Sequence, residues 1–223
     1  MSKKYPRTSH FPYSPGATND DRIMSFADLE VLVTYGNLVF TEKLDGSNVC
    51  LTSNEVFARS HFGAPTHVSF NSLKKLHDQI NYLIPEGMSI FGEWTYAVHS
   101  INYSMMTHPL NIFGVRDDSN GQWWHWEEVE EIAKELRLPT VPVLLRGPVS
   151  NKDNLQEIIE TLGSLSSIYG PLREGVVVRI EKGVSDDGER LQGVAKWVRA
   201  NHVQTTDHWT RQQVKRQPTL NMV

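Results

Sequence analysis

Short apolar segments typical of β-strands outnumber the helical segments in this chain, and their order is the feature that most restricts its fold. Four segments carry apolar residues at helical spacing, and they do not alternate with single strands in a regular pattern. This order is typical of an α+β fold with largely antiparallel sheets, and not of repeated βαβ units. The expected strands are Leu38–Phe40, Val49–Leu51, Val56–Ala58, Met88–Tyr96, Leu110–Arg116, Val141–Leu145, Gly175–Ile180 and Val194–Val198, and the expected helices contain Phe26–Val33, Leu73–Ile84, Val129–Leu136 and Leu155–Leu162.

The composition is that of a folded protein. Hydrophobic residues make up 39% of the 223 residues and charged residues 22%, which excludes wholesale disorder, collagen and a coiled coil. No apolar run approaches the roughly 20 residues that cross a bilayer, and no apolar stretch of a secretory signal follows the basic N-terminus. The single cysteine, Cys50, excludes an internal disulfide framework. We therefore expect a cytoplasmic protein (in the host cytoplasm if it is viral) with no membrane partner.

The net charge and the distribution of turn-forming residues add two expectations. The net charge is −4, so binding to a polynucleotide would require a local cationic groove and a divalent metal. The first residues are rich in Pro, Ser, Gly and Asn and lack periodicity. We expect one domain over 1–223, with an N-terminal arm over 1–24, a core over 25–200 and a tail over 201–223.

The segment Lys43-Leu44-Asp45-Gly46 is the sharpest candidate for chemistry. Its structural interpretation is a charged hairpin turn with Asp-Gly at the tip. Its functional interpretation is that a lysine leaving a buried strand just before such a turn is partly desolvated. Desolvation and nearby cations favour the uncharged amine, whose lone pair can attack phosphorus.

Five further residues at strand positions could complete a site around such a lysine. Each also has an ordinary structural interpretation: solvated strand-end cations, a core aromatic residue, or acidic side chains that protect sheet edges. The five residues are Arg59, Glu93, Phe113, Glu174 and Lys196.

Together and in this order, these residues resemble the motifs of the covalent nucleotidyltransferase superfamily of polynucleotide ligases and mRNA capping enzymes. The resemblance is closest to ATP-dependent RNA ligases of the phage nick-sealing type and covers about residues 38–200. It implies a nucleotidyltransferase (ATP-grasp-like ligase catalytic) domain of antiparallel sheets flanked by helices. Lys43–Gly46 is similar to motif I, Arg59 to motif Ia, Glu93 to the ribose-binding glutamate, Phe113 to the aromatic residue of motif III, Glu174 to motif IV and Lys196 to motif V.

The resemblance implies an RNA ligase that joins 5′-phosphate and 3′-hydroxyl ends. Lys43 would take AMP from ATP as a lysyl-AMP phosphoramidate, the AMP would pass to the 5′ end, and the 3′-hydroxyl would then displace it. Glu174 would hold Mg²⁺ or Mn²⁺, and Lys196 would contact the α-phosphate. The RNA partner could be a nicked duplex, single-stranded ends or an RNA–DNA hybrid. The oligomeric state stays open, with a monomer slightly favoured.

The same resemblance implies nucleotide contacts elsewhere in the chain. Glu93 would accept a hydrogen bond from the ribose 2′-hydroxyl, Phe113 would stack on adenine, and Arg59 would bind the ribose or the phosphates. Asp45 and Gly46 would shape the turn after the lysine.

Positions next to these motifs refine the resemblance. Glu42 is similar to the RNA-ligase residue that accepts from the adenine amino group, and Asn48 matches the phage RNA-ligase pattern. Motif V usually has two cations separated by one residue, but here Val198 takes the second place and Arg199 follows, so Arg199 is a shifted candidate.

The short segment after residue 200 limits how the protein could bind RNA, and two other classes of protein are alternatives to an RNA ligase. Only 23 residues follow, too few for an appended OB domain, so we expect RNA contacts from the arm, from the tail with Lys215 and Arg216, or from an oligomer. A capping-type guanylyltransferase is disfavoured by Glu42, Asn48 and the missing OB domain. A non-catalytic nucleotide- or nucleic-acid-binding module with the same fold is disfavoured by the intact lysine and glutamates.

Overall fold

The computed structural model describes residues 4–34, 36–58, 64–201 and 214–219 and divides into two compact units. Unit 1 comprises Met1–Tyr5, Asp45–Val141 and Thr205–Val223, and unit 2 comprises Pro6–Leu44 and Pro142–Gln204. The division into an arm, a core and a tail at residues 24 and 200 stays a prediction, and most of the expected tail lies outside the described residues.

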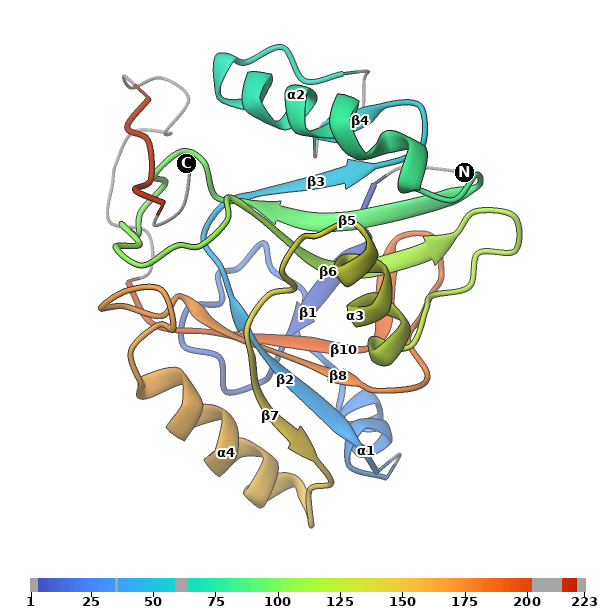
Figure 1. Ribbon diagram of the computed structural model, residues 1–223. Coiled ribbons are helices and arrows are strands. Elements are labelled where there is room, and N and C mark those ends of the chain that lie inside the picture. The colour runs from blue at the N-terminus through green and yellow to red at the C-terminus, as the bar shows by residue number, and fades with distance from the viewer. Residues whose placement is uncertain (1–3, 35, 59–63, 202–213, 220–223) are drawn as a thin grey trace. The chain divides into compact units, whose positions relative to one another are not determined.

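Unit 2 is built on a six-stranded sheet with the order β1-β10-β8-β2-β7, in which β9 pairs with β10 (Figure 1). All of its strand pairs are antiparallel except β1 with β10. The expected α+β class with largely antiparallel sheets is therefore confirmed. The strands are β1 Arg7–His10, β2 Leu38–Lys43, β7 Val143–Gly147, β8 Gly175–Ile180, β9 Ser185–Asp186 and β10 Arg190–Val198.

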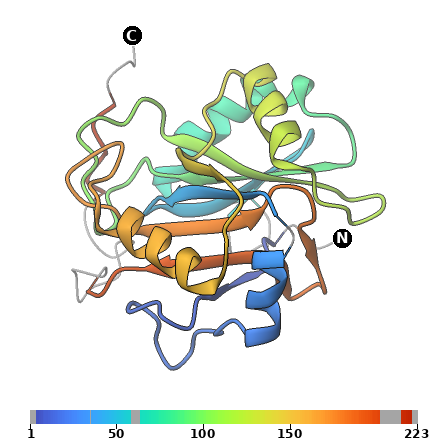
Figure 2. The same ribbon diagram turned by 90° about the horizontal axis from the view of Figure 1, so that it is seen from below.

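Helices α1 (Phe26–Thr34) and α4 (Lys152–Ser164) cover one face of this sheet, as Figures 1 and 2 show from two sides. Their apolar residues join those of the central strands in one buried cluster, which is the main source of stability for this unit. The cluster contains Leu29 and Leu32 from α1, Leu155 and Ile159 from α4, Leu38 and Phe40 from β2, Val176, Val178 and Ile180 from β8, and Ala195 and Trp197 from β10. The opposite face of the sheet therefore remains available for polar side chains.

Unit 1 is built on a four-stranded antiparallel sheet with the order β4-β3-β5-β6. The expected helix over residues 73–84 is shorter in the structure, because α2 ends at Ile80 and a 3-10 turn, η2 Asn81–Leu83, continues the chain to Pro85. Within the described ranges, no helix has both the length and the apolar content that a membrane span requires. The remaining elements are β3 Ser47–Leu51, β4 Val56–Ala58, β5 Met88–Trp94, β6 Leu110–Asp117, η1 Val68–Phe70, α2 Asn71–Ile80 and α3 Trp126–Glu135.

Gly175 provides a test of the tight contact between β8 and β10. A Cβ atom on Gly175 would lie 2.1 Å from the carbonyl oxygen of Trp197, and a backbone atom cannot move aside as a flexible side chain can. We expect Gly175→Ala to lower the free energy of unfolding by about 2 kcal/mol or more, because an added methyl group in a close-packed site forces backbone shifts. Thermal or urea denaturation measures the change.

Gly114→Ala is the matched control, because Gly114 also lies in a strand. There an added Cβ would be 3.4 Å from its nearest neighbour, a ring carbon of Trp123. The free energy of unfolding of this variant should be unchanged or higher by up to about 1 kcal/mol, because alanine lowers the conformational entropy of the unfolded chain. Equal stability of the two variants would contradict the packing described here.

Candidate active site

Lys43 and Glu174 form the centre of the candidate site in unit 2. Lys43 is the last residue of β2, and Glu174 immediately precedes the neighbouring strand β8. The Lys43 ammonium donates a hydrogen bond of 2.6 Å to Glu174 Oε1. The side chain of Glu174 is only 7% exposed and that of Lys43 is 26% exposed, so the amine lies where desolvation acts but reagents can reach it.

The register of the central strands places Lys196 on the same face of the sheet as Lys43. Lys43 lies opposite Gly175, and the next row two residues along contains Thr41, Val177 and Lys196. Cross-strand partners share a face, and residues two apart on one strand do so too. The two lysines therefore stand in adjacent rows on the face opposite the apolar cluster.

Glu42 lies on the other face of β2 and is buried, with 1% of its surface exposed. Its Oε2 atom accepts a hydrogen bond from the backbone N–H of Ile168 at 2.9 Å and lies 3.5 Å from Nε of Arg173. Burial raises the pKa of the Glu42 carboxyl above its ordinary value, although the hydrogen bonds and Arg173 oppose this shift. Among the residues that the structure describes, none makes a hydrogen bond to its other oxygen, Oε1.

Arg199 follows β10 directly after the position at which the family pattern has its second cation. Its backbone N–H donates to the carbonyl oxygen of Glu174 at 3.0 Å, which ties the two segments together. The Nε and Nη2 atoms of its guanidinium are buried, and the described part of the chain offers them no hydrogen-bond acceptor. Two such donors are suited to an anion such as phosphate.

In unit 1, the turn after the lysine is held by backbone and side-chain contacts to residues 94–103. Asp45 Oδ2 accepts hydrogen bonds from the backbone N–H groups of Ser100 and Ile101 at 2.7 and 2.8 Å. The N–H of Asp45 donates to the Tyr103 hydroxyl at 2.8 Å. A Cβ on Gly46 would lie 2.7 Å from the carbonyl oxygen of Trp94, so only glycine fits here. The predicted loop-shaping role of Asp45 and Gly46 is consistent with these contacts.

Asn48 and Glu93 lie directly opposite each other on β3 and β5, so they share one face of the unit 1 sheet. Phe113 on β6 is 9% exposed, and its ring packs edge-on against Tyr5 with centroids 4.9 Å apart. Tyr5 also contacts Phe91, which stands on the same face of β5 as Glu93. Arg59, which is also a predicted site residue, lies outside the described residues.

Sequence reasoning missed three residues that contact predicted site residues within the two units. Arg173 pairs with Glu42, Asp21 lies 3.7 Å from the Lys196 ammonium, and Tyr103 accepts from Asp45. For Arg173 a signal was present, because a charged pair, Arg173-Glu174, directly precedes an apolar strand. Asp21 and Tyr103 carry no local signature, since their partners are distant in sequence.

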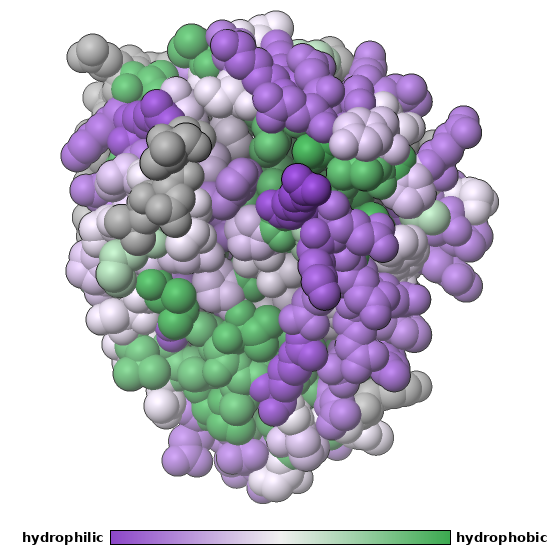
Figure 3. Space-filling model, in the orientation of Figure 1, coloured by the Kyte–Doolittle hydropathy of each residue, from purple (hydrophilic) through white to green (hydrophobic). Residues whose placement is uncertain are grey.

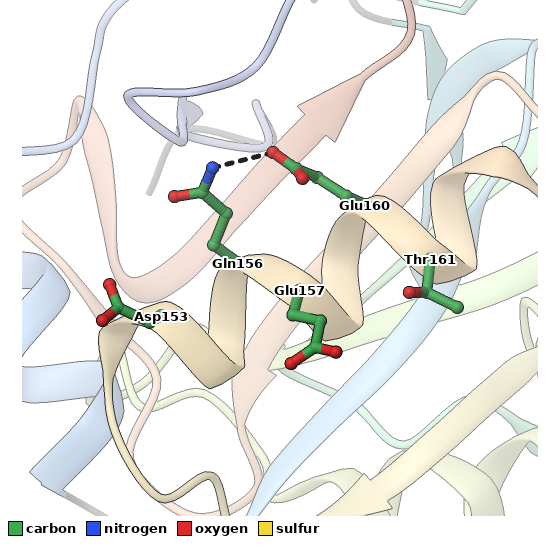
Figure 4. Close-up of a pocket in the computed structure, with 5 residues that line it drawn as sticks. All are labelled: Asp153, Gln156, Glu157, Glu160 and Thr161. Atoms are coloured by element: carbon green, nitrogen blue, oxygen red, sulfur yellow. Dashed lines mark hydrogen bonds between the residues drawn. The ribbon is translucent and has the colours of Figure 1, made fainter.

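A pocket along α4 has a lining that differs in charge from the candidate site. The pocket has a volume of about 390 Å³ and is lined by Asp153, Gln156, Glu157, Glu160 and Thr161. Figure 4 shows these five side chains on the helix. Three of these five side chains are acidic, which disfavours phosphate groups. In Figure 3, apolar side chains gather in the region where Figure 1 draws α4.

The family model described as RNA ligase matches residues 36–198. The chain belongs to the RNA ligase family. The match covers most of the sequence and contains every predicted site residue except Arg199. No curated protein sequence matches this RNA ligase family member.

Solved structures of RNA ligases share its fold at low sequence identity. A Naegleria gruberi RNA ligase mutant with ATP and Mn matches 93% of this chain with a TM-score of 0.58 and 15% sequence identity. The N. gruberi RNA ligase with PPi matches 89% of this chain with a TM-score of 0.60 and 16% sequence identity. An archaeal ATP-dependent RNA ligase matches 88% of this chain with a TM-score of 0.57 and 16% sequence identity. This chain spans 64%, 60% and 48% of those three chains. The nucleotidyltransferase fold expected from the motifs is thereby confirmed.

The buried pair of Glu42 and Arg173 yields a stability prediction. The side chain of Arg173 is 3% exposed, and it also donates to the carbonyl oxygen of Leu162. Arg173→Met should lower the free energy of unfolding by at least about 3 kcal/mol, because it leaves the Glu42 carboxylate buried without its counter-ion. Urea denaturation near neutral pH measures this loss.

The pH dependence separates the charge effect from lost packing. Folded Glu42 holds its proton more tightly than the unfolded chain does, so protonation favours the folded state. Arg173→Met should therefore recover part of its lost stability when the pH is lowered from about 7 to about 5. Arg22→Met, at the exposed pair with Glu189, is the control and should cost less than about 1 kcal/mol. A loss in Arg173→Met that does not change with pH would argue against a buried carboxylate.

Proposed function

We propose that this RNA ligase family member is an ATP-dependent RNA ligase that joins 5′-phosphate and 3′-hydroxyl ends through a lysyl-AMP intermediate. The observation that supports the proposal most strongly is the placement of the Lys43 amine, 2.6 Å from a buried carboxylate and on the same sheet face as Lys196. A nucleophile, an acidic partner and a second cation are the groups that nucleotidyl transfer to an amine requires.

In the first step, Lys43 Nζ attacks the α-phosphorus of ATP. A nitrogen–phosphorus bond forms, the bond from the α-phosphorus to the bridging oxygen breaks, and pyrophosphate leaves with the electron pair. The amine must first lose its extra proton. Lys196, in the neighbouring row of the sheet, supplies positive charge for the oxygens of the five-coordinate transition state.

In the second step, an oxygen of the RNA 5′-phosphate attacks the phosphorus of lysyl-AMP, and the Lys43 amine is released. In the third step, the RNA 3′-hydroxyl attacks the 5′-phosphate, a phosphodiester bond forms and AMP leaves. Lys43 itself is reprotonated in the second step, when its bond to AMP breaks. Its ion pair with Glu174 can then form again before the next cycle.

We assign nucleotide recognition in unit 2 to Glu42 and Arg199. The buried Oε1 atom of Glu42, which lacks a hydrogen-bond partner within the described residues, can accept from an exocyclic amino group. Adenine carries such a group where guanine carries an oxygen, which favours ATP over GTP. The buried Nε and Nη2 donors of Arg199 suit a phosphate.

In unit 1, we assign nucleotide contacts to Asn48, Glu93 and Phe113, with Arg59 as a further candidate. Asn48 and Glu93 face the same side of the sheet as cross-strand partners, which suits two polar contacts to one ligand. The ring of Phe113 offers a surface on which adenine can stack, once Tyr5 leaves room for it.

A divalent cation, Mg²⁺ or Mn²⁺, fits Glu174. Within the described parts of the chain, no group of three or more His, Cys, Asp or Glu side chains could hold a metal by itself. Magnesium sites in nucleotide enzymes commonly use one or two carboxylates together with substrate phosphates and water. When bound, the cation neutralises phosphate charge and favours the uncharged amine.

Two other functions remain testable alternatives. A capping-type guanylyltransferase would accept GTP in place of ATP, which the Glu42 carboxylate disfavours. A non-catalytic binding module would bind nucleotide or RNA without covalent transfer. We further propose that the two units act as one catalytic domain in the cytoplasm, with RNA ends or nicked duplexes as partners.

Covalent labelling with α-labelled ATP tests the proposed function. We expect the wild-type protein, incubated with ATP and Mg²⁺, to carry label that survives denaturation. Lys43→Ala should carry none, because the attacking amine is missing. Lys182→Ala, which removes an exposed lysine after β8, is the control and should label like the wild type.

Each outcome of this experiment decides between the functions. Labelling by GTP but not by ATP would support the guanylyltransferase. Absence of label with either nucleotide, despite measurable binding, would support the binding module. Equal labelling of Lys43→Ala and the wild type would refute Lys43 as the nucleophile.

Arg199 gives a separate test of phosphate recognition. We expect Arg199→Ala to lower kcat/KM for self-adenylylation by about 100-fold, the usual cost of losing one preorganised donor in a transition state. Arg190→Ala removes an arginine at the other end of β10, where it pairs with Asp28, and should have little effect. Equal rates for the two variants would remove Arg199 from the site.

A further inference from the structure

The segment from His10 to Met24 is fixed against β10 beside Lys196. The N–H of Phe11 donates to the carbonyl oxygen of Lys196 at 2.9 Å, and His10 lies opposite Lys196 in the parallel pairing of β1 and β10. His10 in turn exchanges two backbone hydrogen bonds with the returning chain, one with the carbonyl oxygen of Arg22 and one with the N–H of Met24, each 2.7 Å long. These contacts determine where Asp21 lies.

The Asp21 carboxylate is held by three donors and lies near the Lys196 ammonium. Thr18 donates to Oδ2 through its backbone N–H at 3.1 Å and through its hydroxyl at 2.9 Å. On the other side, Oδ1 is 3.2 Å from Nε2 of His10 and 3.7 Å from Nζ of Lys196. Burial raises the pKa of Asp21, but the Thr18 hydrogen bonds and the electrostatic interactions with His10 and Lys196 together outweigh it, so the net pKa is below its ordinary value and the group is a carboxylate.

His10 links this carboxylate to the backbone of β10. Burial, and next the charge of Lys196, lower the pKa of His10 to about 4, so its ring is neutral near pH 7. The hydroxyl of Ser14 accepts from the N–H of Val198 at 2.9 Å and lies 2.9 Å from Nδ1 of His10. The hydroxyl hydrogen has two acceptors in reach, the Val198 carbonyl oxygen at 3.5 Å and the nearer Nδ1. When it points to Nδ1, Nε2 is the donor to Asp21.

We propose that Asp21 is a positioning residue that holds the Lys196 ammonium in its catalytic place. This inference rests on the proposed role of Lys196 at the α-phosphate. The carboxylate is fixed through Thr18 and His10 while Lys196 remains 23% exposed, so the ammonium is oriented without being closed off. Asp21 also offsets the repulsion between Lys196 and Lys43, which stand in adjacent rows on the same face.

The first measurement needs no catalysis. Competitive acetylation with acetic anhydride, followed by mass spectrometry, reports the reactivity of Lys196 in the protein without nucleotide. We expect Asp21→Asn to raise this reactivity at least about threefold, because an ammonium without its carboxylate loses its proton more readily. Asp20→Asn, the same change at the exposed neighbouring residue, should leave it unchanged.

The second measurement is single-turnover self-adenylylation as a function of ATP concentration. Asp21→Asn should lower the maximal rate about 10- to 100-fold, the usual effect of a misplaced catalytic group. The apparent KM for ATP should be unchanged or lower, because a negative charge near the triphosphate has been removed. Asp21→Glu, which keeps the carboxylate, should recover part of the rate, and Asp20→Asn should match the wild type.

The outcomes separate this inference from the proposed function. Unchanged Lys196 reactivity in Asp21→Asn would overturn the contact itself. Raised reactivity with an unchanged maximal rate would overturn the positioning role. A lower labelled fraction at an unchanged rate constant would also overturn it, since that pattern reports misfolding. A wild-type protein that ATP does not label would refute the proposed ligase chemistry and the positioning role, while the acetylation result would still judge the contact.

Discussion

The ion pair between Lys43 and Glu174 is the interaction on which the candidate site depends. The two residues are 131 positions apart in sequence, and only the antiparallel pairing of β2 with β8 brings their atoms to 2.6 Å. Glu174 is nearly buried, so the ion pair compensates its charge in a poorly solvated position. The pair also holds the Lys43 amine against the carboxylate of Glu174. A ligand that engages Glu174 would weaken this hold on the amine.

The same sheet carries a second charged pair, formed by Lys196 and Asp21, in the row next to the first. One face of unit 2 thus presents two cations, each with its own carboxylate, while the opposite face is covered by α1 and α4. These two cations lie side by side on one sheet face of a chain whose net charge is −4. The strand register brings Lys43 and Lys196 together on one face of the unit 2 sheet. By contrast, α4 carries acidic side chains on its exposed side.

Much of the fold could be predicted from the sequence, and so could the candidates for the site, because the relevant signals are local. Short apolar segments indicate the strands, and Lys43 and Glu174 each lie directly at a strand boundary. Contacts between distant segments leave no such signal. Nothing near Asp21 indicates that it faces Lys196. Nor does any pattern show that the ring of Phe113, predicted to stack on adenine, is packed edge-on by Tyr5.

A crystal structure of the protein incubated with ATP and Mg²⁺ tests the central claim most directly. We predict continuous electron density from Lys43 Nζ to the phosphorus of AMP, with the amine moved away from Glu174 Oε1. Density for a nucleotide joined to another residue would contradict this account. A bound nucleotide with Lys43 still paired to Glu174 and far from any phosphate would contradict it as well.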